Sequence, residues 1–360
     1  MKGLPHVLTL FARKPPPVGT TPADVVHTEN KLRLLRYRRS TPATFATPVI
    51  LVPSLINRHY VLDLLPTKSF AAWLVARGFD VYCIDWGTPG DEDRFLTFDE
   101  ICDGYLGRAL RMTARVAGSE KVHVLGYCMG GILATIHTAA RPEHIASLVT
   151  LAAPVRFDGE GLLGSWTRSP TFDVGAMVAA YGNVPWTLLQ GAFHMLRPTL
   201  TLQKMVHLLD RAWDDESLDG FLAIEKWGSD NVSIPGAFHQ RYIEDLYQRD
   251  LLAKGEFVLS GRPARLDAIR CPTLAVTFEH DNIVPWKSAK ELVDRVSSKD
   301  KEWLHLPGGH VGAVVSKSAS QRLWPKIAAF WEERDAPLKK SGSRKRTAVR
   351  ARHTPLQSTR

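Results

Sequence analysis

HVLGYCMGG, residues 123–131, is the most informative stretch of the chain. An apolar run typical of a buried strand leads into it, and a helical stretch of small residues follows it through Ala140. Gly126, Cys128 and Gly130 have the spacing of a nucleophile elbow, a strained turn between a strand and a helix. The helix N-terminus favours a thiolate on Cys128, and the backbone amide of Met129 is expected to face a developing oxyanion. The plain alternative is a buried structural cysteine in a glycine-rich turn.

Short apolar runs alternate with helical patterns on both sides of this turn. This alternation is typical of βαβ units and predicts an α/β fold, with a mostly parallel sheet and helices on both faces. The expected strands are 48–52, 79–84, 122–125, 145–151, 272–277 and 303–306, and the other expected helices are 69–77, 98–116, 288–296 and 319–333.

The alternation is interrupted by residues 155–255, which have helical periods and few strand-like runs. The sequence therefore predicts a core formed by residues 21–154 and 256–335, with a mostly helical cap inserted at 155–255. Such an insertion is expected to cover a site at the carboxyl ends of the strands. Residues 1–20 are expected to form an N-terminal extension, and residues 336–360 a basic disordered tail.

A thiol nucleophile needs a base and a group that orients the base, and in the hydrolase chain order an acid and then a histidine follow the nucleophile. Asp281 follows an expected strand in TLAVTFEHDNIVPW, where Glu279 and His280 are alternatives that lie less deep in the turn. His310 follows the next expected strand in WLHLPGGHVG, in a glycine-rich loop that lets the ring reach the sulfur. The order Cys128, Asp281, His310 predicts a catalytic triad.

A second oxyanion donor is expected in the loop VPSLINRHYVLDL, residues 52–64, which follows the first central strand. The backbone amide of Leu55 is the candidate. Asn57, Arg58 and Asp63 could fix the loop by hydrogen bonds. A capped loop without a catalytic part is the alternative.

Two other features allow more than one interpretation. Asp85 ends an expected strand, but its place in the chain order favours a capping role over that of the catalytic acid. The tryptophans of the insertion could line an acyl channel or simply pack in a core; they are Trp166, Trp186, Trp213 and Trp227.

The composition excludes several classes of protein. Of 360 residues, 44% are hydrophobic and 23% are charged, which excludes wholesale disorder and collagen-like repeats. No run approaches the roughly 18 apolar residues that span a bilayer, and no signal peptide is expected. The four cysteines lack CxxC spacing and the 13 histidines lack HExxH spacing, so no metal or cofactor is expected.

The net charge of +9 is unevenly distributed. Residues 337–360 carry eight Lys and Arg and no acid, so 9 − 8 leaves about +1 for the rest. The tail could bind nucleic acid or another anionic surface, or it could be a solvated extension.

Seven segments between residues 21 and 331 together resemble the polyhydroxyalkanoate synthases, which belong to the α/β-hydrolase superfamily. The length is similar to that of the short, class III catalytic subunits, which work with a separate partner subunit. The segments are VPSLINRHYVLDLLP (52–66), FDVYCIDWGTPGDED (79–93), HVLGYCMGGILA (123–134), LAAPVRF (151–157), WGSDNVSIPGAFHQRYIEDLYQRDLLAKGEF (227–257), CPTLAVTFEHDNIVPW (271–286) and LPGGHVG (306–312).

The resemblance implies a function and roles for the triad. Cys128 would accept the acyl group, His310 would deprotonate the thiol, and Asp281 would orient His310 or help to activate the 3-hydroxyl of the incoming unit. The substrates would be an (R)-3-hydroxyacyl-coenzyme A and a growing polyester chain, and coenzyme A would be released. The insertion would cover the site and mediate homodimerisation, and the protein would be cytoplasmic, at the surface of polyester granules. The chain departs from the family where Asn282 follows Asp281, because the family often has Asp-His there.

Three other functions make different predictions. A cysteine-dependent hydrolase on the same fold, such as a thioesterase, esterase or depolymerase, would release free hydroxyacid. A non-catalytic scaffold on granules would have a disrupted triad. A nucleic-acid-binding protein would bind through its tail with a steep salt dependence.

Overall fold

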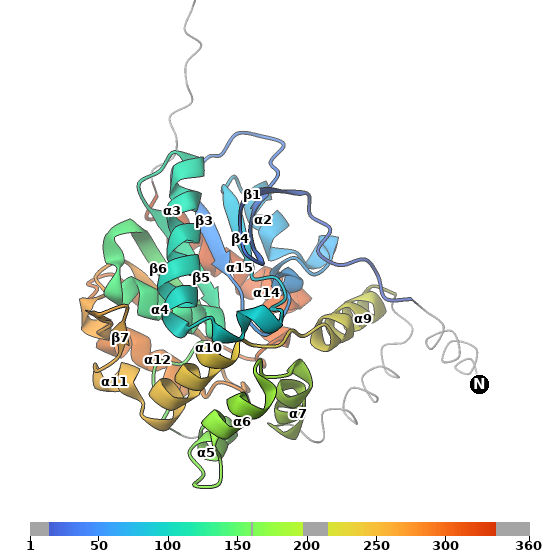
Figure 1. Ribbon diagram of the computed structural model, residues 1–360. Coiled ribbons are helices and arrows are strands. Elements are labelled where there is room, and N and C mark those ends of the chain that lie inside the picture. Colours follow the sequence, from blue (N-terminus) through green and yellow to red (C-terminus); the bar gives the residue numbers. More distant parts are fainter. Residues whose placement is uncertain (1–13, 160, 197–214, 336–360) are drawn as a thin grey trace, which may run out of the picture.

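An eight-stranded sheet lies at the centre of the protein (Figure 1). The computed structural model describes residues 14–159, 161–196 and 215–335, so the predicted tail at 336–360 and most of the predicted N-terminal extension lie outside the described residues. The strands follow the order β1-β2-β4-β3-β5-β6-β9-β10 across the sheet. Their bounds are Ala23–Glu29 (β1), Leu32–Tyr37 (β2), Val49–Val52 (β3), Val81–Asp85 (β4), Val122–Tyr127 (β5), Ile145–Leu151 (β6), Thr273–Phe278 (β9) and Lys301–Leu306 (β10).

The sheet is mostly parallel, as the sequence predicts. All neighbours from β4 to β10 pair in parallel, whereas β1 pairs antiparallel with β2, and β2 antiparallel with β4. Because β5, β9 and β10 run in the same direction, the segments that follow them emerge at one edge of the sheet.

Two hydrophobic clusters cover the two faces of the sheet. In β3, Ile50 and Val52 belong to one cluster, and Val49 and Leu51 belong to the other. Alternate residues of a strand point to opposite faces, and here both faces are buried. This is why the central strands are continuous apolar runs rather than alternating ones.

Helices pack on both faces of the sheet. The first cluster includes residues of α3 (Leu106–Ala117), α4 (Met129–Ala140) and α12 (Trp286–Arg295). The second includes residues of α2 (Phe70–Ala76), α13 (Gly312–Val315), α14 (Lys317–Arg322) and α15 (Trp324–Glu332). Local signals set some helix ends: the Ser69 hydroxyl accepts a hydrogen bond from the Ala72 amide at the start of α2, and Gly118 ends α3 at φ 70°.

Residues 155–255 form helices and, in their described part, contribute no strand to the central sheet. They contain α5 (Leu162–Thr167), α6 (Val174–Tyr181), α7 (Trp186–Leu196), α9 (Asp215–Ser229), α10 (Gly236–Arg241), a π-helical turn (Tyr242–Gln248) and α11 (Leu251–Lys254). The beginning and the end of this insertion are joined. The Phe157 amide donates to Oδ1 of Asp250 at 2.9 Å, and the Phe157 ring contacts Tyr247 with 4.9 Å between ring centroids.

Three features differ from the expected elements. The ribbon of β1 and β2 was not among the predicted strands. The helix expected at 98–116 begins with a π-helical turn at Glu100–Tyr105. The last expected helix is divided into α14 and α15, because Pro325 is tolerated only in the first turn of a helix.

The remaining elements are short. They are a hairpin of β7 (Val258–Leu259) and β8 (Arg262–Pro263), and 3-10 turns at His59–Leu62, Pro66–Lys68, Asp91–Phe95, Pro142–His144 and Leu266–Ala268. Among the described helices, none combines the length and the apolar character needed to cross a membrane.

Candidate active site

Cys128 lies in a sharp turn between β5 and α4. Its backbone has φ 55° and ψ −125°, a strained conformation for a residue with a side chain. A Cβ atom on Gly126 would lie 2.4 Å from the Gly131 Cα, and one on Gly130 would lie 2.0 Å from the Val52 carbonyl oxygen. The glycines are therefore required by close backbone contacts, and the turn has the form of a nucleophile elbow.

His310 and Asp281 form a buried pair. His310 Nδ1 lies 2.7 Å from Asp281 Oδ2, and the Asp281 side chain has 0% exposure. The other oxygen, Oδ1, accepts hydrogen bonds from the amides of Ile283 at 2.9 Å and Val284 at 2.8 Å. The fixed carboxylate therefore holds a proton on Nδ1 and leaves Nε2 for the thiol of Cys128.

The electrostatics of the site favour a charged imidazole. Burial opposes the charge on His310, but Asp281 and Cys128, which both hydrogen-bond to the ring, outweigh it and raise the pKa of His310 well above its usual range. A proton taken up at Nε2 is therefore retained on His310.

Tyr127, the residue before Cys128, also contacts the histidine. Its ring stacks on the His310 ring with 5.3 Å between centroids, and its hydroxyl donates to the His310 carbonyl oxygen at 3.2 Å. Sequence reasoning did not identify this contact. The only signal for it was an aromatic residue directly before the cysteine.

A cavity of about 500 Å³ opens above Cys128 and His310. Loops of the sheet edge form one side of it, and α7 and α9 of the insertion form the other. The insertion contributes both apolar and polar side chains to the lining, His194 and Glu225 among the polar ones. Its described lining includes Phe193, Leu196, Ile224, Trp227, Asn57, Gln190, Asn231 and Asn282.

The two expected oxyanion donors lie differently. Met129 is the first residue of α4, so its amide has no acceptor within the helix. Leu55 lines a smaller pocket beside Trp86, whereas its neighbours Ile56 and Asn57 line the cavity that contains Cys128. The donor roles of both amides stay predictions.

Asp85 has the capping role that its position favoured. Its Oδ1 accepts from the Gly87 amide at 3.1 Å, and Arg33 Nε donates to its Oδ2 at 3.1 Å. Burial opposes ionisation, but His59, Arg33 and the Gly87 amide outweigh it and hold the pKa of Asp85 well below its usual range. The acid beside His310 is Asp281.

The alternative acid and base and the tryptophans of the insertion differ in where the structure places them. Glu279 and His280 are exposed. Trp227 lines the cavity and Trp186 is exposed, while Trp213 lies outside the described residues. In the described chain, no group of three His, Cys, Asp or Glu side chains is arranged to hold a metal ion.

Comparisons with known proteins identify the fold. The family described as alpha/beta hydrolase fold matches residues 47–315, and the family described as the N-terminus of poly-beta-hydroxybutyrate polymerase (PhaC) matches residues 16–74. The solved structure of a soluble variant of monoglyceride lipase from Saccharomyces cerevisiae matches 90% of this chain and 99% of its own, with a TM-score of 0.55 and 13% identity. A thermophilic esterase from Thermogutta terrifontis matches 88% of this chain and 100% of its own, with a TM-score of 0.50 and 17% identity. These structures share the fold.

Curated relatives give the family. The chain is 36% identical over 320 residues to the poly(3-hydroxyalkanoate) polymerase subunit PhaC of Allochromatium vinosum, covering 88% of this chain and 90% of that protein. It is 35% identical over 319 residues to the subunit of the same name from Haloferax mediterranei, covering 88% of this chain and 65% of that protein's length. The chain therefore belongs to the poly(3-hydroxyalkanoate) polymerases, a family of acyltransferases with the α/β-hydrolase fold.

Proposed function

We propose that the protein polymerises (R)-3-hydroxyacyl-coenzyme A into a polyhydroxyalkanoate and releases coenzyme A, with Cys128 as the acyl carrier. One observation carries this proposal: His310, held by Asp281 at 2.7 Å, and the elbow cysteine face the same cavity in a chain related to poly(3-hydroxyalkanoate) polymerases.

The first step loads Cys128. His310 takes the thiol proton at Nε2, and the thiolate attacks the carbonyl carbon of the substrate thioester. The amide of Met129 stabilises the oxyanion that forms. The bond between the carbonyl carbon and the coenzyme A sulfur breaks, and the leaving thiolate takes the proton from His310. The energies of the two thioesters are similar, so this step is readily reversible.

The second step makes the ester. The 3-hydroxyl of an incoming hydroxyacyl-coenzyme A gives its proton to His310 and attacks the carbonyl carbon on Cys128. A C–O bond forms, the C–Sγ bond breaks, and the lengthened chain leaves on the incoming coenzyme A. Return of this chain to Cys128 releases that coenzyme A. Conversion of a thioester to an ester drives the sequence forward.

The apolar part of the cavity lining supports this acceptor over water. Apolar side chains of the insertion, among them Phe193 and Ile224, lie on the side of the cavity opposite the sheet. A site with few waters slows hydrolysis of the acyl-enzyme, whereas a hydrolase requires water at the same carbon.

The expected assembly and location of the protein depend on its assignment as a polyester synthase. We include in the proposal a homodimer, a possible partner subunit and a place at the surface of cytoplasmic polyester granules. No cofactor is needed, because coenzyme A is part of the substrate.

Incubation with (R)-3-hydroxybutyryl-coenzyme A, beside the Cys128→Ala variant, tests the proposal. The expected result is thiol release together with insoluble polyester, and loss of both in the variant. Thiol release with only soluble 3-hydroxybutyrate would assign a cysteine-dependent hydrolase instead. No thiol release, including with longer acyl chains and with added partner subunits from related systems, would contradict the synthase assignment.

A further inference from the structure

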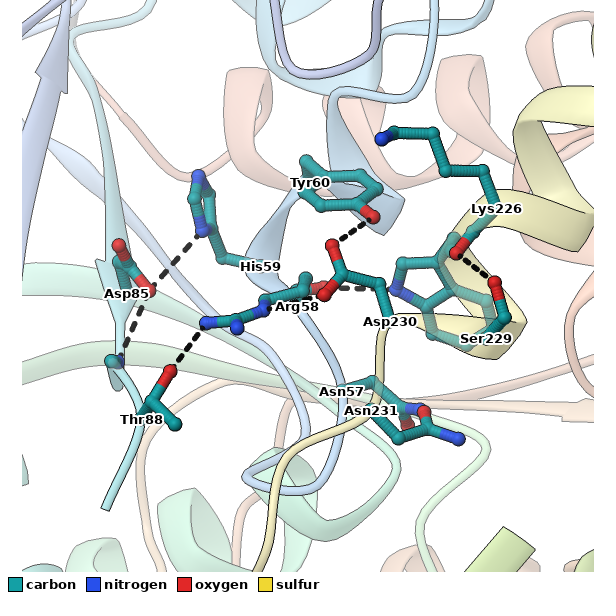
Figure 2. A network of polar contacts seen from close by, with 12 residues as sticks. Asn57, Arg58, His59, Tyr60, Asp85, Thr88, Lys226, Ser229, Asp230 and Asn231 are labelled. Atoms are coloured by element: carbon teal, nitrogen blue, oxygen red, sulfur yellow. Dashed lines mark hydrogen bonds and ion pairs between the residues drawn. The ribbon is translucent and has the colours of Figure 1, made fainter. Parts of the chain in front are cut away.

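The loop that follows β3 is tied to the end of α9 by a dense set of polar contacts (Figure 2). The two segments pair in an antiparallel bridge at Asn57 and Asn231, and the Val232 amide donates to the Ile56 carbonyl at 3.0 Å. The side-chain amide of Asn57 also donates to Oδ1 of Asn231. The insertion thus holds the loop through both backbone and side chains.

Asp230 is the acceptor at the centre of these contacts (Figure 2). Its Oδ1 accepts from Arg58 Nε at 3.2 Å, and its Oδ2 accepts from the Tyr60 hydroxyl at 2.8 Å. Burial and the contact with Asp230 raise the pKa of Tyr60, so the hydroxyl keeps its proton and remains a donor. One carboxylate therefore accepts hydrogen bonds from two residues of the loop, Arg58 and Tyr60.

Arg58 extends these contacts to the segment that follows β4. Its Nη1 donates to the Thr88 hydroxyl at 2.9 Å, in the segment after β4. Its carbonyl oxygen accepts from Trp227 Nε1 at 2.9 Å. The loop is thus held between the sheet edge and the insertion, with Asp230 as the charged partner on the insertion side.

The same loop forms one wall of the nucleophile site. A Cβ on Gly130 would lie 2.5 Å from the Pro53 carbonyl oxygen, so the start of the loop touches the elbow directly. Ile56 and Asn57 line the cavity together with Cys128. A shift of this loop would therefore move any oxyanion donor that it supplies, while the pair of His310 and Asp281, in the loops after β10 and β9, would stay in place.

We propose that Asp230 is a positioning residue: through Arg58 and Tyr60 it fixes the loop that completes the oxyanion side of the acyl-transfer site. This inference deepens the proposed function and rests on it for the acyl-enzyme at Cys128. It makes the insertion part of the catalytic geometry, beyond a cover for the substrate. It also separates two reactions of Cys128: acyl transfer develops an oxyanion, whereas alkylation by iodoacetamide does not.

The test compares Asp230→Ala with the wild type, using p-nitrophenyl butyrate as acyl donor and mass spectrometry to detect acylated Cys128. Misplacement of an oxyanion donor lowers rates by roughly 10²-fold, so we expect acylation to fall at least about 10-fold through kcat. The rate of Cys128 alkylation by iodoacetamide is expected to stay within about twofold, because the wild-type geometry of His310 and Asp281 is retained.

Matched variants separate this role from a general loss of structure. Asp24→Ala also removes an exposed carboxylate paired with an arginine, Arg38, and should leave both rates unchanged. Asp230→Asn keeps one acceptor oxygen and should restore part of the acylation rate. Asn231→Ala removes the side-chain hydrogen bond from Asn57 and, like Asp230→Ala, should lower the acylation rate.

The outcomes are distinguishable. Equal acylation rates in the wild type and Asp230→Ala, or a parallel fall in alkylation, would overturn the positioning role. Acylation of the wild type on Cys128 without polymerisation of (R)-3-hydroxybutyryl-coenzyme A would contradict the proposed function alone. No acylation of wild-type Cys128 by either donor would overturn both.

Discussion

At Gly130 the elbow has no room for a side chain. The carbonyl oxygens of Val52 and Pro53 would lie 2.0 Å and 2.5 Å from an added Cβ. Both are backbone atoms, so no change of a side-chain rotamer could relieve the clash. The cysteine at φ 55° is thus held by its neighbours, which supply the packing that offsets its strain.

Gly130→Ala is expected to abolish acyl transfer and to lower the free energy of unfolding by about 1–3 kcal/mol, the range for overpacking a close contact. Gly191→Ala, in α7 where an added Cβ meets no atom within 4 Å, serves as control and should be neutral or stabilising. Urea denaturation and the coenzyme A release assay measure both effects. Wild-type activity in Gly130→Ala would show that β3 and the elbow can move apart.

Asp281→Asn is expected to lower the pKa of His310 toward its usual range, because the largest favourable charge beside the ring is removed. A raised pKa in the native state stabilises the protein below the unfolded pKa of about 6.5, and this contribution is lost as pH rises through the native pKa. The variant should therefore lose less stability than the wild type when the pH is raised from neutral to alkaline. Acyl transfer should fall by at least about 10²-fold, because the ring is no longer held as the base.

NMR titration of the His310 ring measures the first effect directly. Equal titration midpoints in Asp281→Asn and in the wild type would contradict the electrostatic role given to Asp281.

Contacts with other elements of the fold determine the conformation of the loop after β10. It contains Gly308, Gly309 and Gly312 around His310, so its own backbone restricts it little. The contacts with Tyr127 and Asp281 therefore determine where the ring lies.

Tyr127→Phe keeps the stacked ring but removes the hydroxyl that donates to the His310 carbonyl. We expect a cost of about 1 kcal/mol in stability and a loss of a few-fold in kcat. Tyr127→Leu removes both contacts and should reduce kcat further, with a smaller effect on KM. Steady-state kinetics of both variants and the wild type measure kcat and KM. Identical kcat values in all three proteins would show that Asp281 alone holds the loop.

Elements with strong local signals could be predicted, and those set by tertiary contacts could not. The strands at 145–151 and 272–277 are buried on both faces and read as apolar runs. The β1–β2 ribbon lies at the sheet edge, where half-exposed residues weaken that signal; the turn at Asn30, with φ 49°, was its best marker.

The residues of the candidate site also differ in whether the sequence could predict them. Chain order indicated Cys128, Asp281 and His310 as candidates. No local pattern could place Asp230 against Arg58, because 172 residues separate them and only the folded insertion brings them together.

Three histidines are buried in the protein without a nearby negative charge strong enough to keep them protonated. Burial lowers the pKa of His123, His137 and His239 to about 4 each. They lie in different elements of the fold, in β5, α4 and α10.

Stability should fall as the pH drops from about 6.5 toward 4, because the unfolded chain binds protons in this window and the native state does not. Each histidine contributes up to about 3 kcal/mol to this loss. His239→Phe, at a site where the ring Nδ1 has no partner among the described residues, should reduce the acid-induced loss by about that amount. Urea midpoints between pH 4 and 7 measure it, and parallel curves for the two proteins would contradict the assignment.

The joined ends of the insertion make it an exchangeable cassette. The Phe157 amide and Oδ1 of Asp250 lie 2.9 Å apart, so a graft cut at these two points leaves the strands of the central sheet uncut. Such a graft must keep Asp230 and Asn231, which hold the loop after β3. Recombination between relatives at these points replaces the α7 and α9 side of the cavity in a single event. Under the proposed function, we expect such an exchange of one contiguous segment to change the monomer preference.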